Sequence, residues 1–376
     1  MAALRNDIDP DGLLEYSVVY TDRALNHMSG SFQSVMTDIS AILKEAYNAT
    51  STAVIPGGGT YAMEAVARQF AGKKRCMVLR NGWFSYRWTQ ILDTTNIALE
   101  TEVLNAVRTE DSDTAPFSPV AIEEVCEAIR SYKPDVFFAP HVETSAGMIL
   151  PDDYLAKIGN AVADVGGLFV LDCIASGTIW VDMKDKHIDV LISAPQKGWS
   201  GPACAGLVAM SDRATERLAT TKSDSYACDL GKWREIMKTY EDGAHAYHAT
   251  MPTDALRASR DQMQETKSIG FAETRKRQEQ LGSEVRAMLA KHGLQSVAAP
   301  GFEAPGVVVV YTDEPSIKNG SRFMAEGVQV AAGVPLMVGE GESFSTVRFG
   351  LFGLDKLADI PGAVQRLETA LVKAIV

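Results

Sequence analysis

The sequence predicts an α/β protein with a mostly parallel sheet covered by helices on both faces, followed by a smaller α+β unit. Short apolar runs alternate with helical segments, and these runs are continuously apolar, as in strands that are buried on both faces. The pattern changes after about residue 255, and 376 residues allow two to three domain-sized units. We therefore expect an N-terminal segment (1–20), a large domain (21–255) and a small C-terminal domain (256–376).

The elements of the large unit follow from hydrophobic periodicity. From Phe32 to Ala46, apolar residues recur at steps of three and four, which predicts a helix with Ser31 as its N-cap. The expected strands are short β-rich runs: Ala53–Ile55, Cys76–Leu79, Val136–Ala139, Leu168–Leu171, Val190–Ser193 and Gly206–Met210. The helical segments between them are Thr60–Phe70, Pro119–Ser131 and Asp152–Val165.

The small unit begins with a long helical segment. A charge-rich helix is expected to run from Gln264 to Lys291, with Gly293 as its stop signal. Two candidate strands follow, at Val307–Tyr311 and Thr346–Phe349, and a closing helix is expected from Asp355.

Composition excludes several classes of protein. The 36 Lys and Arg residues against 48 Asp and Glu residues give a net charge of −12, which disfavours nucleic acid and anionic membranes as partners. The five cysteines are scattered without a C-x-x-C pair, and no apolar run approaches the ~20 residues that span a bilayer. The N-terminus lacks the pattern of a signal peptide. We expect a soluble, cytoplasmic protein.

A glycine-rich turn follows the first expected strand. In Gly57-Gly58-Gly59-Thr60, main-chain N–H groups at a helix start could bind an anion such as phosphate. A tight strand-to-helix turn would explain these glycines equally well. The spacing fits neither the P-loop nor the dinucleotide-binding fingerprint.

Two charged residues end expected strands. Asp172 directly follows Leu168–Leu171, where ligands of open α/β sheets bind, although Asp is also a common turn-former. Lys197 follows Val190–Ser193 between Pro195 and Trp199. Burial there would favour its neutral amine, which can form a Schiff base, whereas most lysines are solvated surface charges.

Metal binding has weak support in the sequence. His141-Val142-Glu143 lacks the P-C-x-x-C that a zinc deaminase requires, and His245-x-x-His248 has no evident third ligand. We predict no metal site.

Read in order, these motifs resemble those of the class V aminotransferases of pyridoxal-phosphate fold type I, especially the alanine/serine–glyoxylate group. The resemblance runs from about residue 25 to the C-terminus. It includes the aromatic segment Asn81–Arg87 (NGWFSYR), the turn His141–Gly147 (HVETSAG), and Tyr247–Pro252 (YHATMP). It implies that fold, pyridoxal 5'-phosphate as cofactor, and a homodimer with shared active sites.

The resemblance also implies a role for individual residues. Phosphate contacts fall to Gly58, Gly59, Thr60 and Gln196, and, from the neighbouring subunit, to Tyr247 and Thr250. Ring contacts fall to Phe84 (stacking), Ile174 (the opposite face), Ser145 (the 3-oxygen) and Asp172 (the pyridine nitrogen). Lys197 would form the Schiff base, and Arg348 would bind the substrate carboxylate.

The implied activity is transamination between a small amino acid (alanine- or serine-like) and a small 2-oxo acid (glyoxylate- or pyruvate-like). The alternative is a pyridoxal-phosphate-dependent lyase, of the β-elimination or ammonia-lyase type, on a small amino acid or aminophosphonate. A non-catalytic binding module would need none of Lys197, Asp172 and Arg348, and the glycine spacing argues against a nucleotide-dependent oxidoreductase.

Three departures from the family pattern lie where substrate side chains would bind. Asn26–Gly30 replaces the usual G-P-G-P segment, Ser85 replaces a glycine, and Gly201–Gly206 keeps the Pro-Pro-Gly segment only in part. These changes leave the amino donor and acceptor open.

Overall fold

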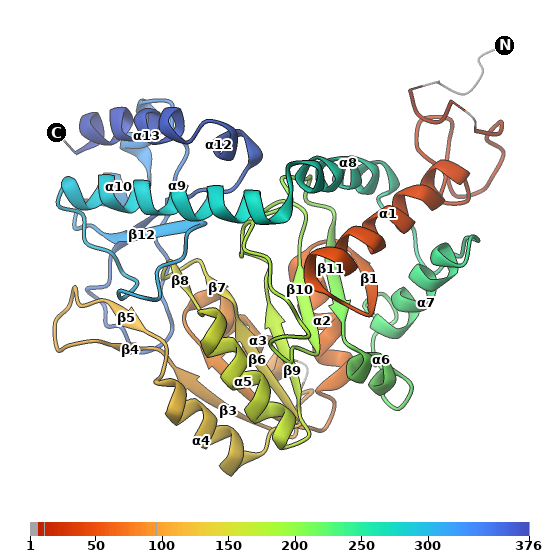
Figure 1. Cartoon of the computed structure of the whole chain (residues 1–376), viewed down its shortest axis with the longest axis horizontal. Coiled ribbons are helices and arrows are strands. Elements are labelled where there is room, and N and C mark those ends of the chain that lie inside the picture. Colours follow the sequence, from red (N-terminus) through yellow and green to blue (C-terminus); the bar gives the residue numbers. More distant parts are fainter. Residues whose placement is uncertain (1–6, 11, 95, 376) are drawn as a thin grey trace.

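The computed structural model describes residues 7–10, 12–94 and 96–375 (Figure 1). Its centre is a seven-stranded sheet in the order β1-β11-β10-β9-β6-β2-β3. The strands are β1 (Ser51–Pro56), β2 (Arg75–Arg80), β3 (Glu100–Asn105), β6 (Val136–Pro140), β9 (Leu168–Asp172), β10 (Val190–Ser193) and β11 (Ala205–Met210). Only β11 among them runs antiparallel to its neighbours, so the expected mostly parallel sheet is confirmed.

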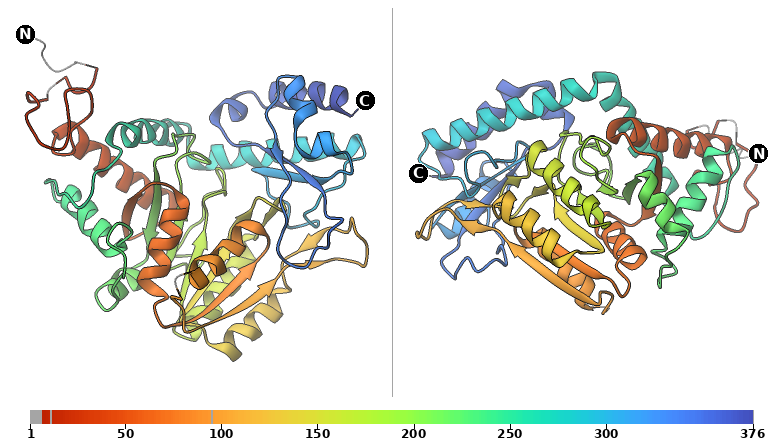
Figure 2. Two further views of the ribbon diagram at one scale, coloured as in Figure 1. Left: turned by 180° about the vertical axis from the view of Figure 1, so that it is seen from behind. Right: turned by 60° about the horizontal axis from the view of Figure 1, so that its bottom comes forward.

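Helices cover both faces of this sheet. In Figure 1, α4 (Ile122–Tyr132) and α5 (Asp152–Asp164) lie in front of it, and α2 (Gly59–Phe70) and α3 (Trp83–Thr94) lie behind it. The reversed view in Figure 2 agrees. β6, β9, β10 and β11 are buried along their whole length, which explains their continuously apolar sequences.

One outer group of helices packs beside β1 and β11. It consists of α1 (Gly30–Tyr47), α6 (Asp212–Leu218), α7 (Leu230–Glu241) and α8 (Thr253–Ile269). The expected cap of α1 at Ser31 is wrong by two residues. Ser29 is the N-cap, because its hydroxyl accepts the N–H of Phe32 at 3.1 Å. The hydroxyl of Ser31 instead donates to the carboxylate of Asp9 at 2.8 Å.

The single helix expected from Gln264 to Lys291 is also wrong. The structure has two helices there, α8 and α9 (Phe271–Lys291), which are separated by Gly270. Gly270 has a φ of +101°, a conformation that no helical residue adopts. The expected stop is confirmed, because α9 ends at Lys291 and Gly293 follows with a φ of +77°.

The C-terminal part contains a three-stranded antiparallel sheet in the order β12-β14-β13. These strands are β12 (Val307–Tyr311), β14 (Thr346–Gly350) and β13 (Ala331–Ala332). The helices of this part are α9, α10 (Pro315–Lys318), α11 (Ser321–Ala325), α12 (Leu354–Ala358) and α13 (Ile360–Ala374). The closing helix expected from Asp355 is thus two helices, and the side chain of Asp359 caps the second one.

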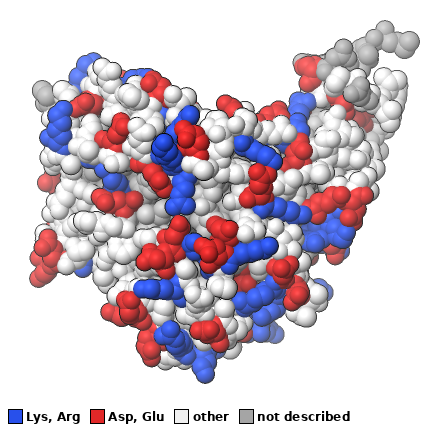
Figure 3. Space-filling model, viewed as in Figure 1, with Lys and Arg blue, Asp and Glu red and all other residues white. Residues whose placement is uncertain are grey.

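Two short strand pairs complete the fold. β4 (Val107–Arg108) pairs with β5 (Phe117–Ser118), and β7 (Val142–Glu143) pairs with β8 (Met148–Ile149). Acidic and basic side chains are interspersed over the face shown in Figure 3. Within the described residues, no helix combines the length and apolar character that crossing a membrane requires.

The two helices around Gly270 pack into different cores. Leu256 and Met263 of α8 belong to the core around the large sheet. Leu281 and Val285 of α9 belong to the core of the small sheet. The expected boundaries at 20/21 and 255/256 remain predictions, and part of the segment 1–20 lies outside the described residues.

Candidate active site

The carboxyl ends of three neighbouring parallel strands bring the main candidates together. Asp172 is the last residue of β9, and it pairs in register with Pro140 of β6 and Ile192 of β10. The turn His141–Gly147 follows β6, and the loop that carries Lys197 follows β10. Because parallel strands end at one edge of the sheet, residues 31 and 25 positions from Asp172 reach the same place.

A cavity of about 200 Å³ lies at this edge. Seven residues from the sequence prediction line it: Gly59, Thr60, Phe84, Asp172, Ile174, Gln196 and Lys197. Gly58, Ser145, Tyr247, Thr250 and Arg348 do not belong to this lining.

Asp172 is a buried carboxyl group with little compensation. Its side chain accepts the N–H of Ile174 at 2.9 Å. The pKa of Asp172 is raised to about 7, chiefly by burial and in smaller part by the nearby Glu143, while the Ile174 hydrogen bond, Arg87 and Lys197 oppose the rise. The site therefore lacks a cation in contact with this carboxylate among the described residues, and a protonated ring nitrogen would supply one.

Lys197 is largely buried, and its amine is less basic than that of a surface lysine. Burial lowers its pKa, Arg348 lowers it further, and Asp172 raises it. Its Nζ atom lies 5.2 Å from the ring centroid of Phe352. The following residue, Gly198, packs so closely that a Cβ atom would lie 1.9 Å from the carbonyl oxygen of Gly177. This close packing fixes the backbone that carries Lys197.

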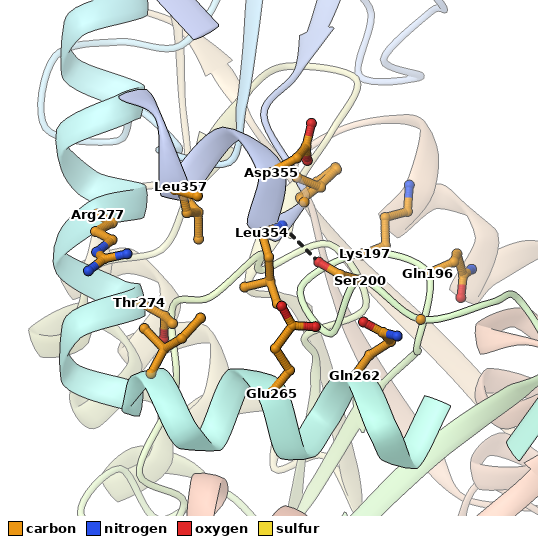
Figure 4. Close-up of a pocket in the computed structure, with 15 residues that line it drawn as sticks. Gln196, Lys197, Ser200, Gln262, Glu265, Thr274, Arg277, Leu354, Asp355 and Leu357 are labelled. Atoms are coloured by element: carbon orange, nitrogen blue, oxygen red, sulfur yellow. Dashed lines mark hydrogen bonds between the residues drawn. The ribbon is translucent and has the colours of Figure 1, made fainter. Parts of the chain in front are cut away.

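Lys197 and Gln196 also line a second, larger cavity of about 580 Å³. Its other walls come from α8, α9 and the segment Phe352–Ala358. Figure 4 shows Lys197 and Gln196 at one end of this cavity and Thr274 and Arg277 at the other. Lys197 is thus reached from two sides.

The glycine-rich turn leads into α2, and the first residues of this helix line the smaller cavity. Gly58 is the N-cap of α2 and has no capping side chain, and the first turn carries no acidic residue. A Cβ atom on Gly59 would lie 2.5 Å from the Cδ1 atom of Ile174. The absence of a side chain therefore lets the helix start approach the cavity, where its N–H groups favour an anion.

Arg87 lines this cavity, although the sequence analysis assigned it no role. Its Nη1 atom donates to the hydroxyl of Thr60 at 2.9 Å, and its Cζ atom lies 5.4 Å from the centroid of Phe84. The motif Asn81–Arg87 contained the signal, because α3 begins at Trp83 and places Phe84 and Arg87 three residues apart on one face.

Ser145, to which the resemblance assigns a contact with the cofactor ring, does not line the smaller cavity. Its side chain is fully buried, where its hydroxyl donates to Glu143 at 2.7 Å and accepts the N–H of Trp83 at 3.0 Å. Thr144 lines the cavity instead. Neighbouring residues of the tight turn thus contact opposite sides.

Glu143 is a second buried carboxylate that the sequence analysis left without a role. It accepts the N–H groups of Phe84, Ser85 and Ser145 and the hydroxyls of both serines, at 2.7 to 3.2 Å. The serine that replaces the family's glycine therefore ties the start of α3 to the turn after β6. This departure at Ser85 is structural.

Arg348 lies beside the smaller cavity. Its Nε atom donates to the carbonyl of Ala332 at 2.8 Å, and its Cζ atom lies 5.6 Å from the centroid of Phe84. Burial lowers its pKa. Tyr247 and Thr250 are exposed and lie with their hydroxyls 3.1 Å apart, outside the cavity of their own chain.

The histidines have other partners. His141 is buried, its Nδ1 atom lies 2.7 Å from the hydroxyl of Ser176, and burial lowers its pKa to about 4. The Nε2 atom of His248 lies 2.8 Å from the carbonyl oxygen of Tyr226. Throughout the part of the chain that the structure describes, no cluster of three or more His, Cys, Asp or Glu residues could hold a metal ion.

Comparisons with known proteins agree with this geometry. No family profile matches the chain. Alanine–glyoxylate aminotransferase from Oryctolagus cuniculus is 25% identical, over 93% of this chain and 86% of that protein. A 2-aminoethylphosphonate–pyruvate transaminase from Salmonella paratyphi A is 23% identical, over 91% and 89%. The chain is related to the class V aminotransferases.

Solved aminotransferases of this kind share the fold. Alanine–glyoxylate aminotransferase from Nostoc sp. has a TM-score of 0.76 at 22% identity, over 92% of this chain and 88% of that chain. Pyridoxamine–pyruvate aminotransferase from Mesorhizobium loti has a TM-score of 0.78 at 17% identity, over 96% and 87%. The chain therefore has the fold of these aminotransferases, pyridoxal-phosphate fold type I.

Some relatives carry a different name, that of soluble hydrogenase subunits. A soluble hydrogenase small subunit from a Synechococcus strain is 26% identical, over 93% of this chain and 87% of that protein. That name stands apart from the transaminase names of the other proteins just described.

The cavity residues fit pyridoxal phosphate as a group. Asp172 is a buried carboxylate without a cation in contact, Lys197 offers an amine with a lowered pKa, and the start of α2 is open to an anion. Phe84 and Ile174 provide apolar walls. Each chemical part of the cofactor thus has a matching group in one cavity of about 200 Å³.

Proposed function

We propose that the protein transfers an amino group between a small alanine- or serine-like amino acid and a small 2-oxo acid such as glyoxylate or pyruvate. The observation that carries this proposal is the meeting of Lys197 and Asp172 in one small cavity at the carboxyl edge of the sheet. The relatives that act on alanine and glyoxylate, or on an aminophosphonate and pyruvate, support a small substrate.

Lys197 would hold the cofactor covalently through its Nζ atom. When bound, pyridoxal phosphate supplies an aldehyde that condenses with amines and a ring that withdraws electrons from the α-carbon of the substrate. When not joined to the cofactor, Lys197 would be a free amine beside that carbon. Its lowered pKa suits a group that accepts the α-proton and returns it one position away.

Asp172 would hold the proton on the ring nitrogen. A carboxylate buried against an apolar wall interacts with that N–H far more strongly than it would in water. Phe84 and Ile174 would flank the ring on its two faces, and Gly59, Thr60 and Gln196 would contact the phosphate. Thr144 is better placed than Ser145 to contact the 3-oxygen.

Arg348 would bind the substrate carboxylate. Its Nε atom is committed to Ala332, so its terminal nitrogens remain for a ligand on the side of Phe84. A planar guanidinium that holds a carboxylate at two points fixes which bond of the α-carbon lies perpendicular to the ring.

The proposal includes a homodimer in which Tyr247 and Thr250 complete the phosphate site of the partner. Their exposure, their position outside their own cavity and their paired hydroxyls support this role.

A half-reaction screen tests the activity. Purified holoenzyme is mixed with single amino acids or aminophosphonates, and conversion of the cofactor to its amine form is followed by absorbance. We expect conversion with a small amino acid and reversal by glyoxylate or pyruvate. Release of ammonia without any need for a 2-oxo acid would instead indicate the lyase reaction, and no spectral change with any amine would contradict both.

A further inference from the structure

The smaller cavity contains two cationic side chains, Lys197 and Arg87, and Arg348 stands beside it. Among the described residues, Arg87 forms no salt bridge with a carboxylate. Its charge lowers the pKa of Asp172, but burial raises that pKa by more. A guanidinium in a cavity without a carboxylate partner is a ready receptor for an anionic ligand group.

The hydrogen bond from Arg87 to Thr60 holds the guanidinium group at the end of the cavity where α2 begins. Thr60 is the second residue of α2, so the guanidinium lies beside the N–H groups that begin that helix. Helix starts and guanidinium groups both favour phosphate, and here they converge within one lining. Arg348 is held elsewhere, by the carbonyl of Ala332, on a strand of the small sheet.

We propose that Arg87 binds the phosphate of the cofactor together with the start of α2, which leaves Arg348, among the described residues at the smaller cavity, as the single guanidinium for the substrate. The site would then take amines and 2-oxo acids that carry one anionic group, either a carboxylate or a phosphonate, and would reject dicarboxylates. This inference rests on the proposed function and narrows its substrate class.

The charges around the cavity explain why a second anionic group is excluded. Lys197 would be joined to the cofactor and Arg87 to its phosphate, while Asp172 and Glu143 are buried carboxylates nearby. A second carboxylate on the substrate would lose its water next to these negative groups without a cation of its own.

The role of Arg87 is tested by binding rather than by turnover. Apoprotein variants Arg87→Gln and Arg87→Lys are titrated with pyridoxal phosphate and, separately, with pyridoxal, which lacks the phosphate. We expect Arg87→Gln to weaken pyridoxal phosphate binding about tenfold or more, with pyridoxal binding nearly unchanged, and Arg87→Lys to recover part of the loss.

A matched control removes a surface guanidinium. Arg366 lies on α13 with a side chain that is 64% exposed, and Arg366→Gln should bind both ligands as the wild type does. Circular dichroism and thermal unfolding of each variant check that the fold is intact. An unchanged ratio of the two dissociation constants in Arg87→Gln would overturn the assignment of Arg87.

The substrate class is tested with wild-type holoenzyme in half-reactions with alanine, serine, 2-aminoethylphosphonate, aspartate and glutamate. We expect the best singly anionic amine to react at least about tenfold more efficiently than either dicarboxylate. A faster reaction with aspartate or glutamate would overturn the inference. If no amine reacts, the proposed function fails, yet the two binding constants still decide the role of Arg87.

Discussion

Asp172 is suited to binding a cofactor, but its buried carboxyl group destabilises the folded protein when no cofactor is bound. The carboxyl group is buried with the N–H of Ile174 as its hydrogen-bond donor, and its pKa is raised to about 7. In the apoprotein the folded state therefore holds a proton that the unfolded state, with a pKa near 3.8, has released between those two values. Stability contributed by this group falls as the pH rises through that range.

The variant Asp172→Asn should make the apoprotein more stable while it weakens the cofactor site. The gain should be near zero at pH 4 and grow to an upper limit of about 4 kcal/mol at pH 8, because Asn mimics the neutral acid. Urea unfolding of both apoproteins at several pH values measures it. A gain that does not depend on pH, or a loss at pH 8, would contradict the buried charge.

His141 should make the protein sensitive to acid. Its folded pKa of about 4 lies below its ordinary value of 6.5, so between these values the unfolded state binds the extra proton. Stability from this group is therefore lost as the pH falls from about 6.5 to 4, by up to about 3 kcal/mol.

The comparison of wild type with His141→Gln isolates this effect. Chemical unfolding of each protein is followed from pH 7.5 to pH 4.5, and the difference between the two should shrink steadily as the pH falls. Parallel curves for the two proteins would show that His141 does not change its protonation on unfolding.

Some of these residues could be predicted from sequence and others could not. Asp172 ends a buried strand and Lys197 lies in the loop after the neighbouring one, and parallel strands end at one edge, so their meeting was predictable. Thr144 and Ser145 differ only in which side of a turn they contact, and no periodicity encodes that. Glu143 could not be recognised because its partners are backbone N–H groups of Phe84 and Ser85.

The junction between α3 and the turn after β6 is tightly packed. A Cβ atom on Gly82 would lie 2.1 Å from the hydroxyl oxygen of Ser145 and 2.8 Å from the Cγ atom of Glu143. Glu143 accepts the backbone N–H of Phe84, and Ser145 accepts that of Trp83. The close approach at Gly82 and the hydrogen bonds to the buried Glu143 thus hold the start of α3 against the turn after β6.

Gly82→Ala should therefore lower the free energy of unfolding by about 1–3 kcal/mol and weaken cofactor binding, because the added methyl group displaces Ser145. Gly72→Ala is the matched control, since nothing lies within 4 Å of its added Cβ atom, and it should change stability by less than about 0.5 kcal/mol. Denaturant unfolding and cofactor titration measure both. Equal stability of the two variants would contradict the tight junction.

The sequence predicted strands and helices correctly where one or both faces of the element are buried, as in β9 and β10. β3 was missed because this edge strand begins with the exposed Glu100, carries a second glutamate at its centre and has no fully buried residue. The break at Gly270 was missed because helical periodicity continues on both sides of it. The chain changes direction at Gly270 because α8 and α9 pack into different cores, and these cores exist only in the folded protein.

Exposed apolar and aromatic side chains support the proposed homodimer. Tyr247 is 54% exposed, and Leu13, Tyr16 and Val18 of the N-terminal segment expose nearly their whole side chains. Figure 1 shows this segment extending from α1 away from the body of the molecule. Large apolar side chains in such a position favour burial against a second copy.

Complementation between two inactive variants tests the shared site. Lys197→Ala and the double variant Tyr247→Phe, Thr250→Val should each be inactive or nearly so, because each lacks one side of every site. When they are unfolded together and refolded, mixed dimers should regain activity, because one of their two sites is intact. Mixtures that stay as inactive as the parents, or a fully active monomer by light scattering, would contradict the proposal.

The central claim is that the amine of Lys197 carries the cofactor, opposite the carboxylate of Asp172. Borohydride reduction of the purified holoenzyme, followed by proteolysis and mass spectrometry, tests it directly. We predict one pyridoxyl-phosphate label per chain, on Lys197, and its loss in Lys197→Ala. A label on another lysine, or no label in protein that binds the cofactor, would contradict the account.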